Sequence, residues 1–209
     1  MVEPLDLYTE QDADPDTLRN LGPLALLAGR FQGERGVDVH PAAQGDEEDH
    51  YVETFDLAAI DPQSNGPQLL YGLRYHQHVL RPGEPETFHD QVGYLLYEPA
   101  TGLVTMSLAI PRAQVALATG YADATASSFT VAARFDEAQA RATQGAFLVE
   151  HFRTVEFSCT FTIEDHDTFT YEECTTLEVT GRGEVIHTDR SRLTRVAAPE
   201  PNPLVEALR

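Results

Sequence analysis

Lysine and tryptophan are both absent from this chain of 209 residues, so its 14 basic residues are all arginines. Without lysine, the chain cannot catalyse through a lysine Schiff base or bind nucleotide phosphates through a P-loop lysine. Basic residues are also few, because 34 acidic residues leave a net charge of −20. A field of this sign repels phosphate backbones and anionic membrane surfaces, so we expect no nucleic-acid and no membrane partner.

Cysteine and long apolar runs are scarce as well. The two cysteines, Cys159 and Cys174, are too few for a disulfide scaffold. Residues 1–11 lack the basic and apolar regions of a secretory signal peptide, and the apolar stretch around residues 23–28 is far shorter than the ~20 residues of a membrane span. The sequence therefore predicts a cytoplasmic protein. It also contains no GxSxG, HExxH or GxGxxG motif, which argues against several enzyme classes.

Most of the chain shows the period-two alternation of half-buried strands, which is clearest in residues 155–163. Ten such segments are separated by turn-forming residues, and they are 30–39, 51–58, 68–80, 87–97, 103–110, 114–121, 129–135, 153–163, 168–179 and 185–196. Ten consecutive strands favour an all-β fold, an antiparallel ten-stranded up-and-down β-barrel, because closure removes exposed edges. A two-sheet sandwich is the alternative.

A short N-terminal helix precedes these strands. Asp16 or Asp14 can cap it, and it carries leucines at helical spacing as far as Leu27, before Gly29. We expect this helix to act as a lid or plug. Residues 1–15 are predicted to form a flexible acidic arm, 16–196 a single barrel domain and 197–209 a C-terminal tail, while 136–149 give the only hint of a second helix.

Three histidines fall on the predicted hairpin of strands 68–80 and 87–97. A turn centred between Gly83 and Glu84 would pair His78 with His89 and His76 with Gln91 on one polar face. That face either meets solvent or lines a cavity. In the second case His76, His78 and His89 could together bind one first-row metal ion.

The last strand carries a fourth candidate histidine. If Leu193 points into the barrel, the same period sends His187, Asp189 and Ser191 inward. The residues expected to face water are Arg190, Arg192 and Thr194. We therefore expect His187 to line the interior, where Asp189 could fix its tautomer.

Cys159 and Cys174 lie on the neighbouring strands 153–163 and 168–179. The turn around residues 165–167 allows two registers, one of which places the two sulfurs opposite each other. We expect free thiols that pack as small hydrophobic side chains.

Several segments resemble the nitrobindin-like heme-binding β-barrels, which are related to fatty-acid-binding proteins and other calycins. Residues 29–33 (GRFQG), followed by Gly36 and Pro41, are similar to the first strand of that family, with Phe31 in place of its tryptophan. Further similar segments are FHDQVGY at 88–94, GLV at 102–104, AIP at 109–111 and LTR at 193–195. Together these similar segments follow the order of the family over residues 22–196. The substitutions within them, such as Phe31 for tryptophan, indicate a divergent branch of that family.

This resemblance implies a barrel that binds heme b, with His187 as the axial iron ligand and His89 and His76 as further cofactor-binding residues. It implies ferric heme that binds nitric oxide and isomerises peroxynitrite. The family places its ligand one position later, where this chain has Thr188. An aromatic–arginine stack of Phe31 and Arg195 could close the floor of the barrel.

Three functions stay open at this stage. The first is heme binding, with peroxynitrite isomerisation if the protein is an enzyme. The second is a non-enzymatic carrier of a small hydrophobic ligand such as a fatty acid, and the third is a metal-dependent enzyme built on His76, His78 and His89. A homodimer is also left open.

Overall fold

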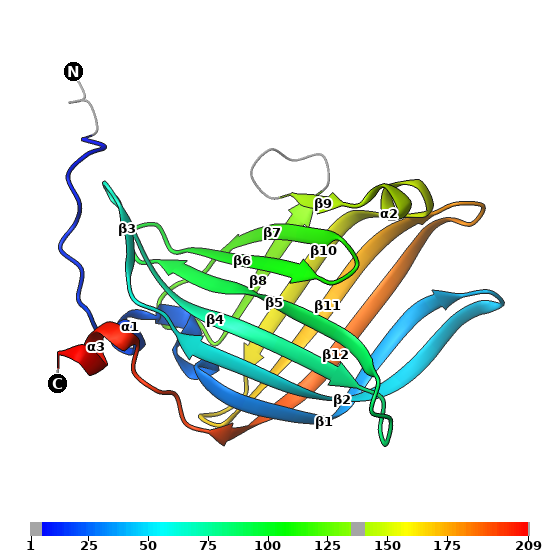
Figure 1. The fold of residues 1–209 in the computed structure, drawn as a ribbon, viewed down its shortest axis with the longest axis horizontal. Coiled ribbons are helices and arrows are strands. Elements are labelled where there is room, and N and C mark those ends of the chain that lie inside the picture. Colours follow the sequence, from blue (N-terminus) through cyan, green and yellow to red (C-terminus); the bar gives the residue numbers. More distant parts are fainter. Residues whose placement is uncertain (1–5, 135–140, 209) are drawn as a thin grey trace.

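Ten long antiparallel strands close into a barrel in the computed structural model, which describes residues 6–134 and 141–208 (Figure 1). The strands are β1 (Gly29–Ala42), β2 (Gly45–Ala59), β4 (Gln68–Leu80), β5 (Thr87–Glu98), β6 (Leu103–Ile110), β7 (Gln114–Tyr121), β8 (Ser128–Arg134), β10 (Phe152–Ile163), β11 (Thr168–Val179) and β12 (Gly183–Ala197). The predicted fold class and all ten predicted strands are confirmed. Phe135, predicted to end one strand, lies outside the described residues.

Each long strand pairs with its neighbours along the chain, and the pairs β1–β12 and β2–β4 complete the ring. Two short strands, β3 (Gln63–Asn65) and β9 (Ala142–Gln144), were not predicted. The strand pairing around the barrel is weakest between β7 and β8, which share one residue pair, Thr119 with Ala132. There β9 pairs with the other half of β7.

The helices are short: α1 (Thr17–Asn20), the 3₁₀ helix η1 (Gly22–Leu27), α2 (Ala146–His151) and α3 (Pro203–Ala207). Helix α2 begins inside the segment 136–149, where the sequence hinted at a second helix, and ends two residues beyond it. Residues 136–140 of that segment lie outside the described residues. No helix of residues 6–134 and 141–208 has the length and apolar character needed to cross a lipid bilayer.

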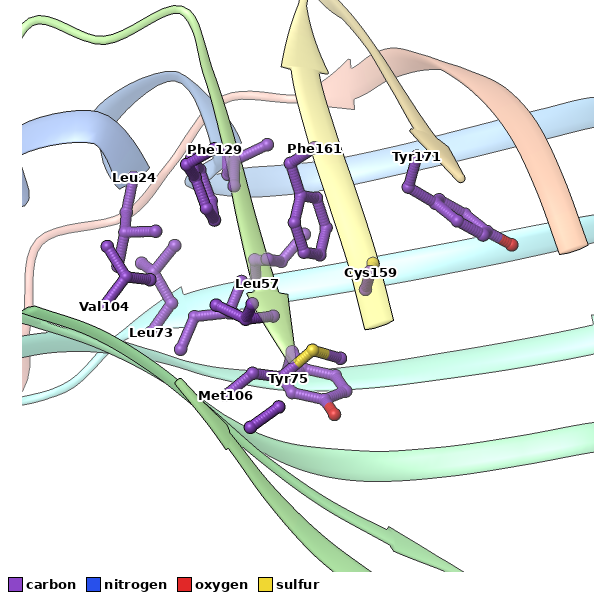
Figure 2. Close-up of a cluster of buried hydrophobic side chains, with 14 of the residues drawn as sticks. Leu24, Leu57, Leu73, Tyr75, Val104, Met106, Phe129, Cys159, Phe161 and Tyr171 are labelled. Atoms are coloured by element: carbon purple, nitrogen blue, oxygen red, sulfur yellow. The ribbon is translucent and has the colours of Figure 1, made fainter. Parts of the chain in front are cut away.

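Helices α1 and η1 close one end of the barrel, as predicted for a plug. Leu21, Leu24 and Leu27 are fully buried there and join the core cluster of the barrel. Figure 2 shows Leu24 among Leu73, Val104 and Phe129, which point inward from their strands. We call the opposite end of the barrel, at the β1–β2 and β11–β12 turns, the distal end.

The predicted stack at the plugged end is confirmed. The guanidinium of Arg195 lies 4.5 Å from the ring centre of Phe31. The same guanidinium donates hydrogen bonds to the Leu26 and His166 carbonyl oxygens, both at 2.9 Å. The last strand is thereby tied to the plug.

Strand β1 contains a bulge that changes which side chains point inward. The pairing of β1 with β2 slips by one residue between Gly33 and Gly36. Phe31 and Gly33 are buried before the bulge, and Gly36 and Asp38 are buried after it. A side chain at Gly36 would collide with the Tyr51 ring, because an added Cβ would lie 2.0 Å from it.

A second bulge lies between β4 and β5, and it makes the predicted pairing of their histidines wrong. Leu80 pairs with Thr87 as the turn predicts, but Val79 then pairs with His89. His78 consequently pairs with Asp90 and His76 with Val92. The extra residue at Phe88 shifts the register by one, which reverses the face on which His89 lies.

The register of β10 and β11 separates the two cysteines. Cys159 pairs with Glu173 and Cys174 with Ser158, so the sulfurs are not opposite each other. Both thiols are free, as expected. Cys159 is fully buried in the core.

The C-terminal segment is anchored to the plugged end by Asn202, whose side chain is fully buried. Its amide nitrogen donates to Asp61 at 2.8 Å and to the Pro15 carbonyl at 3.0 Å, while its oxygen accepts from the Thr17 backbone at 3.1 Å. Residues before β1 and after β12 are thereby held together. The domain limits of 16 and 196 stay a prediction.

Candidate functional site

The barrel interior is divided into an apolar part near the plug and a polar part toward the distal end. Along β12 the inward side chains run from Leu193 through Ser191 and Asp189 to His187. The predicted inward face of this strand is confirmed, as are the exposed positions of Arg190, Arg192 and Thr194.

His187 lies between two inward carboxylates. Its Nε2 atom is 2.5 Å from Asp38 Oδ2 and 3.2 Å from Asp189 Oδ2. The imidazole is 29% exposed and the Asp38 carboxylate only 6%. Burial alone would lower the pKa of His187, but the hydrogen bonds and charges of Asp189 and Asp38 outweigh it and raise this pKa to about 10. His187 is therefore an imidazolium at neutral pH.

The two carboxylates respond differently to this shared cation. Burial opposes ionisation of Asp38, yet the bonds to His187 and His40 leave the pKa of Asp38 below its usual value. For Asp189, burial prevails and its pKa is raised. Of the two, the Asp38 carboxylate lies closer to His187 Nε2, at 2.5 Å against 3.2 Å.

A second imidazole and a third carboxylate complete what we call the Asp–His cluster, made of Asp38, His40, Asp49, His187 and Asp189. His40 Nδ1 is hydrogen-bonded to Asp38 Oδ1, the oxygen that His187 does not use. Asp49 pairs with Asp38 across β1 and β2, and its Oδ2 accepts a 2.8 Å hydrogen bond from Arg81. Three strands thus contribute to the cluster.

A buried carboxyl group, that of Glu53, lies on the plugged-end side of the Asp–His cluster and is 4% exposed. Gln77 donates to it at 2.8 Å and the Tyr171 hydroxyl at 3.1 Å, while Tyr51 and Tyr171 join their hydroxyls at 2.7 Å. Burial raises the pKa of Glu53, and hydrogen bonds from Ser191, Gln77 and Tyr171 offset only part of that rise. Gly33 leaves room for this group, because a Cβ there would lie 2.9 Å from the carboxylate.

Glu173 is a further inward acid, paired with Asp189 on one side and Cys159 on the other. Burial, reinforced by the nearby charge of Asp189, raises its pKa to about 8. The preceding residue, Glu172, is exposed on the opposite face, as expected for neighbours on a strand.

The four candidate histidines do not all meet. His89 faces the interior, where burial lowers its pKa and keeps the ring neutral. His76 and His78 lie on the outer wall, where His76 Nε2 is 2.8 Å from Asp90 Oδ2. The expectation that His76, His78 and His89 share one face is therefore wrong. His76 is separated from the interior by the barrel wall.

A hollow of about 1090 Å³ lies away from the Asp–His cluster. It is bordered by outward side chains such as Arg74, His76 and Tyr94, and by C-terminal residues including Pro199. Its lining contains no member of the Asp–His cluster. The cluster has the denser set of ionisable groups, so we take it as the candidate site.

Sequence reasoning found His187, Asp189 and Ser191 because the period-two pattern of β12 is unbroken. It missed Asp38 and His40, whose inward position depends on the bulge in β1. A strand without that bulge would point Val37 and Val39 inward. The one available signal was the pair Gly33 and Gly36, since glycine inside a strand often marks a bulge.

Two comparisons with known proteins agree with this architecture. Residues 20–195 match the model of the THAP4-like, heme-binding β-barrel domain. The structure of Rv2717c from M. tuberculosis is similar, with a TM-score of 0.60 and 21% sequence identity over 88% of this chain and 99% of that chain. At this identity the likeness shows the fold alone. A search of curated proteins found no match.

Proposed function

Because this chain belongs to the THAP4-like family of heme-binding β-barrel domains, we propose that it binds a ligand at the Asp–His cluster. The observation that supports this proposal is the position of His187, an inward and partly exposed imidazole on the last strand. Functional sites concentrate ionisable groups with shifted pKa values, and this end of the barrel holds several.

Heme b is the ligand that the family suggests, and its fit to His187 is poor in this arrangement. An axial ligand must turn a nitrogen lone pair toward the heme iron, but Asp38 Oδ2 and Asp189 Oδ2 lie 2.5 Å and 3.2 Å from His187 Nε2, where the porphyrin would have to lie. The acids around it would also repel the heme propionates. The neutral ring of His89 is the better donor. Nitric oxide and peroxynitrite chemistry depends on heme and is proposed only together with it.

The carrier hypothesis has less support. The apolar half of the barrel is filled by its own aromatic side chains, including Phe31, Phe55 and Phe169, all 1% exposed or less. The polar half is acidic, which disfavours a fatty-acid carboxylate. A metal-dependent enzyme on His76, His78 and His89 lacks the shared face that it requires.

Three probes test the proposal: hemin, zinc chloride and a fluorescent fatty-acid analogue. We expect at least one of them to raise the thermal unfolding midpoint of the wild-type protein, because a ligand that binds the folded state stabilises it. The matched variants are His187→Ala in the cluster and His76→Ala on the outer wall. The stabilisation should disappear in the first and persist in the second.

The hemin arm also decides whether the family ligand is retained. A Soret band that forms with the wild type and is lost in His187→Ala would establish heme ligation by that residue, whereas loss in His89→Ala alone would assign it to His89. We expect that hemin gives no Soret band that is present in the wild type and lost in His187→Ala. Equal responses of the wild type and His187→Ala to all three probes would overturn the proposed site.

The proposal includes a cytoplasmic location and no nucleic-acid partner, in keeping with the net charge of −20. A homodimer stays a prediction. The ten long strands close into a ring whose weakest pairing, between β7 and β8, is one residue pair, so such a dimer would use that short edge or side-chain surfaces. Cell fractionation and the sedimentation mass are the corresponding measurements.

A further inference from the structure

Three side chains of the Asp–His cluster converge in the way that metal ligands do. One ligand atom from each of Asp38, His187 and Asp189 lies within 4.8 Å of the other two. Asp38 and Asp189 are directly paired across β1 and β12, which run side by side in Figure 1. The convergence is therefore fixed by the backbone of two strands.

The charges of this triad are unbalanced. Two carboxylates share one imidazole, and the Asp38 carboxylate is almost out of contact with water. Two close carboxylates with little solvent repel each other, and a cation between them removes that repulsion. One imidazole and two carboxylates form a mixed donor set that suits divalent zinc, iron or manganese.

A second group of three possible metal ligands also includes Asp38, but one of its carboxylates already has a cationic partner. Asp38, His40 and Asp49 also place ligand atoms within 4.8 Å of one another, but Asp49 is already paired with Arg81 at 2.8 Å. A guanidinium at that carboxylate competes with a metal ion. Within the described residues, the Asp38–His187–Asp189 triad forms its hydrogen bonds and ion pairs internally and with His40 rather than with an arginine, so it is the stronger candidate.

We propose that Asp38, His187 and Asp189 bind a divalent first-row transition-metal ion inside the distal end of the barrel. This inference rests on the proposed function, since it names the ligand class of the same site. The ion takes the place that the imidazolium proton occupies between the two carboxylates. The remaining coordination positions are filled by water, and His40 holds Asp38 in place through its other oxygen.

Titration calorimetry with zinc chloride and cobalt chloride on the full chain tests the proposal. We expect one equivalent to bind, and cobalt to give visible absorption bands that report a nitrogen and oxygen ligand set. Asp189→Asn should weaken zinc binding by on the order of 100-fold, because it removes a ligand charge while keeping the side-chain shape. Circular dichroism of each variant establishes that it is folded.

The matched control is Asp90→Asn, which removes the carboxylate of an Asp–His pair on the outer wall, with His76 at 2.8 Å. It should bind zinc as the wild type does. If Asp90→Asn and Asp189→Asn lose affinity equally, or if the folded wild type binds neither metal, the proposal is overturned.

The outcomes separate this inference from the function on which it rests. Hemin or fatty-acid binding that depends on His187, without zinc or cobalt binding, would leave the proposed site and reject the metal. No response to any probe would reject both. Zinc binding that survives Asp189→Asn and His187→Ala would place the ion elsewhere and reject the triad.

Discussion

Glu53 is an acid that the fold keeps away from water, and its proton makes stability depend on pH. Burial raises its pKa above the usual value of 4.5. The folded state therefore holds a proton that the unfolded chain releases at lower pH. The contribution of Glu53 to the free energy of unfolding is then fully present below pH ~4.5 and is lost as pH rises through its folded-state pKa.

Replacing Glu53 by glutamine should flatten this dependence. The amide cannot ionise, yet it can still hydrogen-bond with Gln77 and Tyr171, so we expect Glu53→Gln to gain stability over the wild type as pH rises above ~5. Urea denaturation between pH 4 and 9 measures the difference. Glu47→Gln, at an exposed position of the same strand, is the control and should follow the wild type. A parallel decline in all three proteins would show that Glu53 is ionised when folded.

At the scale of elements, the period-two pattern was sufficient to predict ten strands and the inward face of β12. It was not sufficient to predict registers. The turn at Gly83 correctly pairs Leu80 with Thr87, but one extra residue then moves His89 to the interior. Bulges change faces without leaving a clear sign in hydrophobicity, so Asp38 and His40 could not be placed from the sequence.

The plug offers a test at this scale because two of its leucines differ sharply in burial. Leu24 is fully buried in the core, whereas Leu26 in the same 3₁₀ helix is 38% exposed. Leu24→Ala should lower the free energy of unfolding by about 2–5 kcal/mol, since it leaves a cavity against the barrel floor. Leu26→Ala should cost about 0.5 kcal/mol. Chemical denaturation measures both, and equal losses would show that η1 does not contribute its buried face to the core.

For the whole molecule, the dominant electrostatic feature is the excess of acid. A net charge of −20 repels itself in the compact state, and added salt screens that repulsion. We expect the thermal unfolding midpoint to rise by several degrees between ~20 mM and ~1 M sodium chloride, where about 1 kcal/mol corresponds to roughly 2–4 °C. Calorimetry at fixed pH measures the shift. A lower midpoint in salt would show that surface ion pairs, such as Arg30 with Asp56, outweigh the net charge.

The bulge in β1 also determines which one-residue deletions this barrel can accommodate without turning inward side chains outward. Glu34 and Arg35 both face solvent there, so deleting one of them would straighten the strand and leave Asp38 and His40 on the inner side. Deleting a residue just beyond Asp38 would instead turn His40 outward. A barrel with one residue fewer at positions 34–35 would therefore keep an equivalent interior, and aligning it with this chain without a gap there would match inward residues with outward ones.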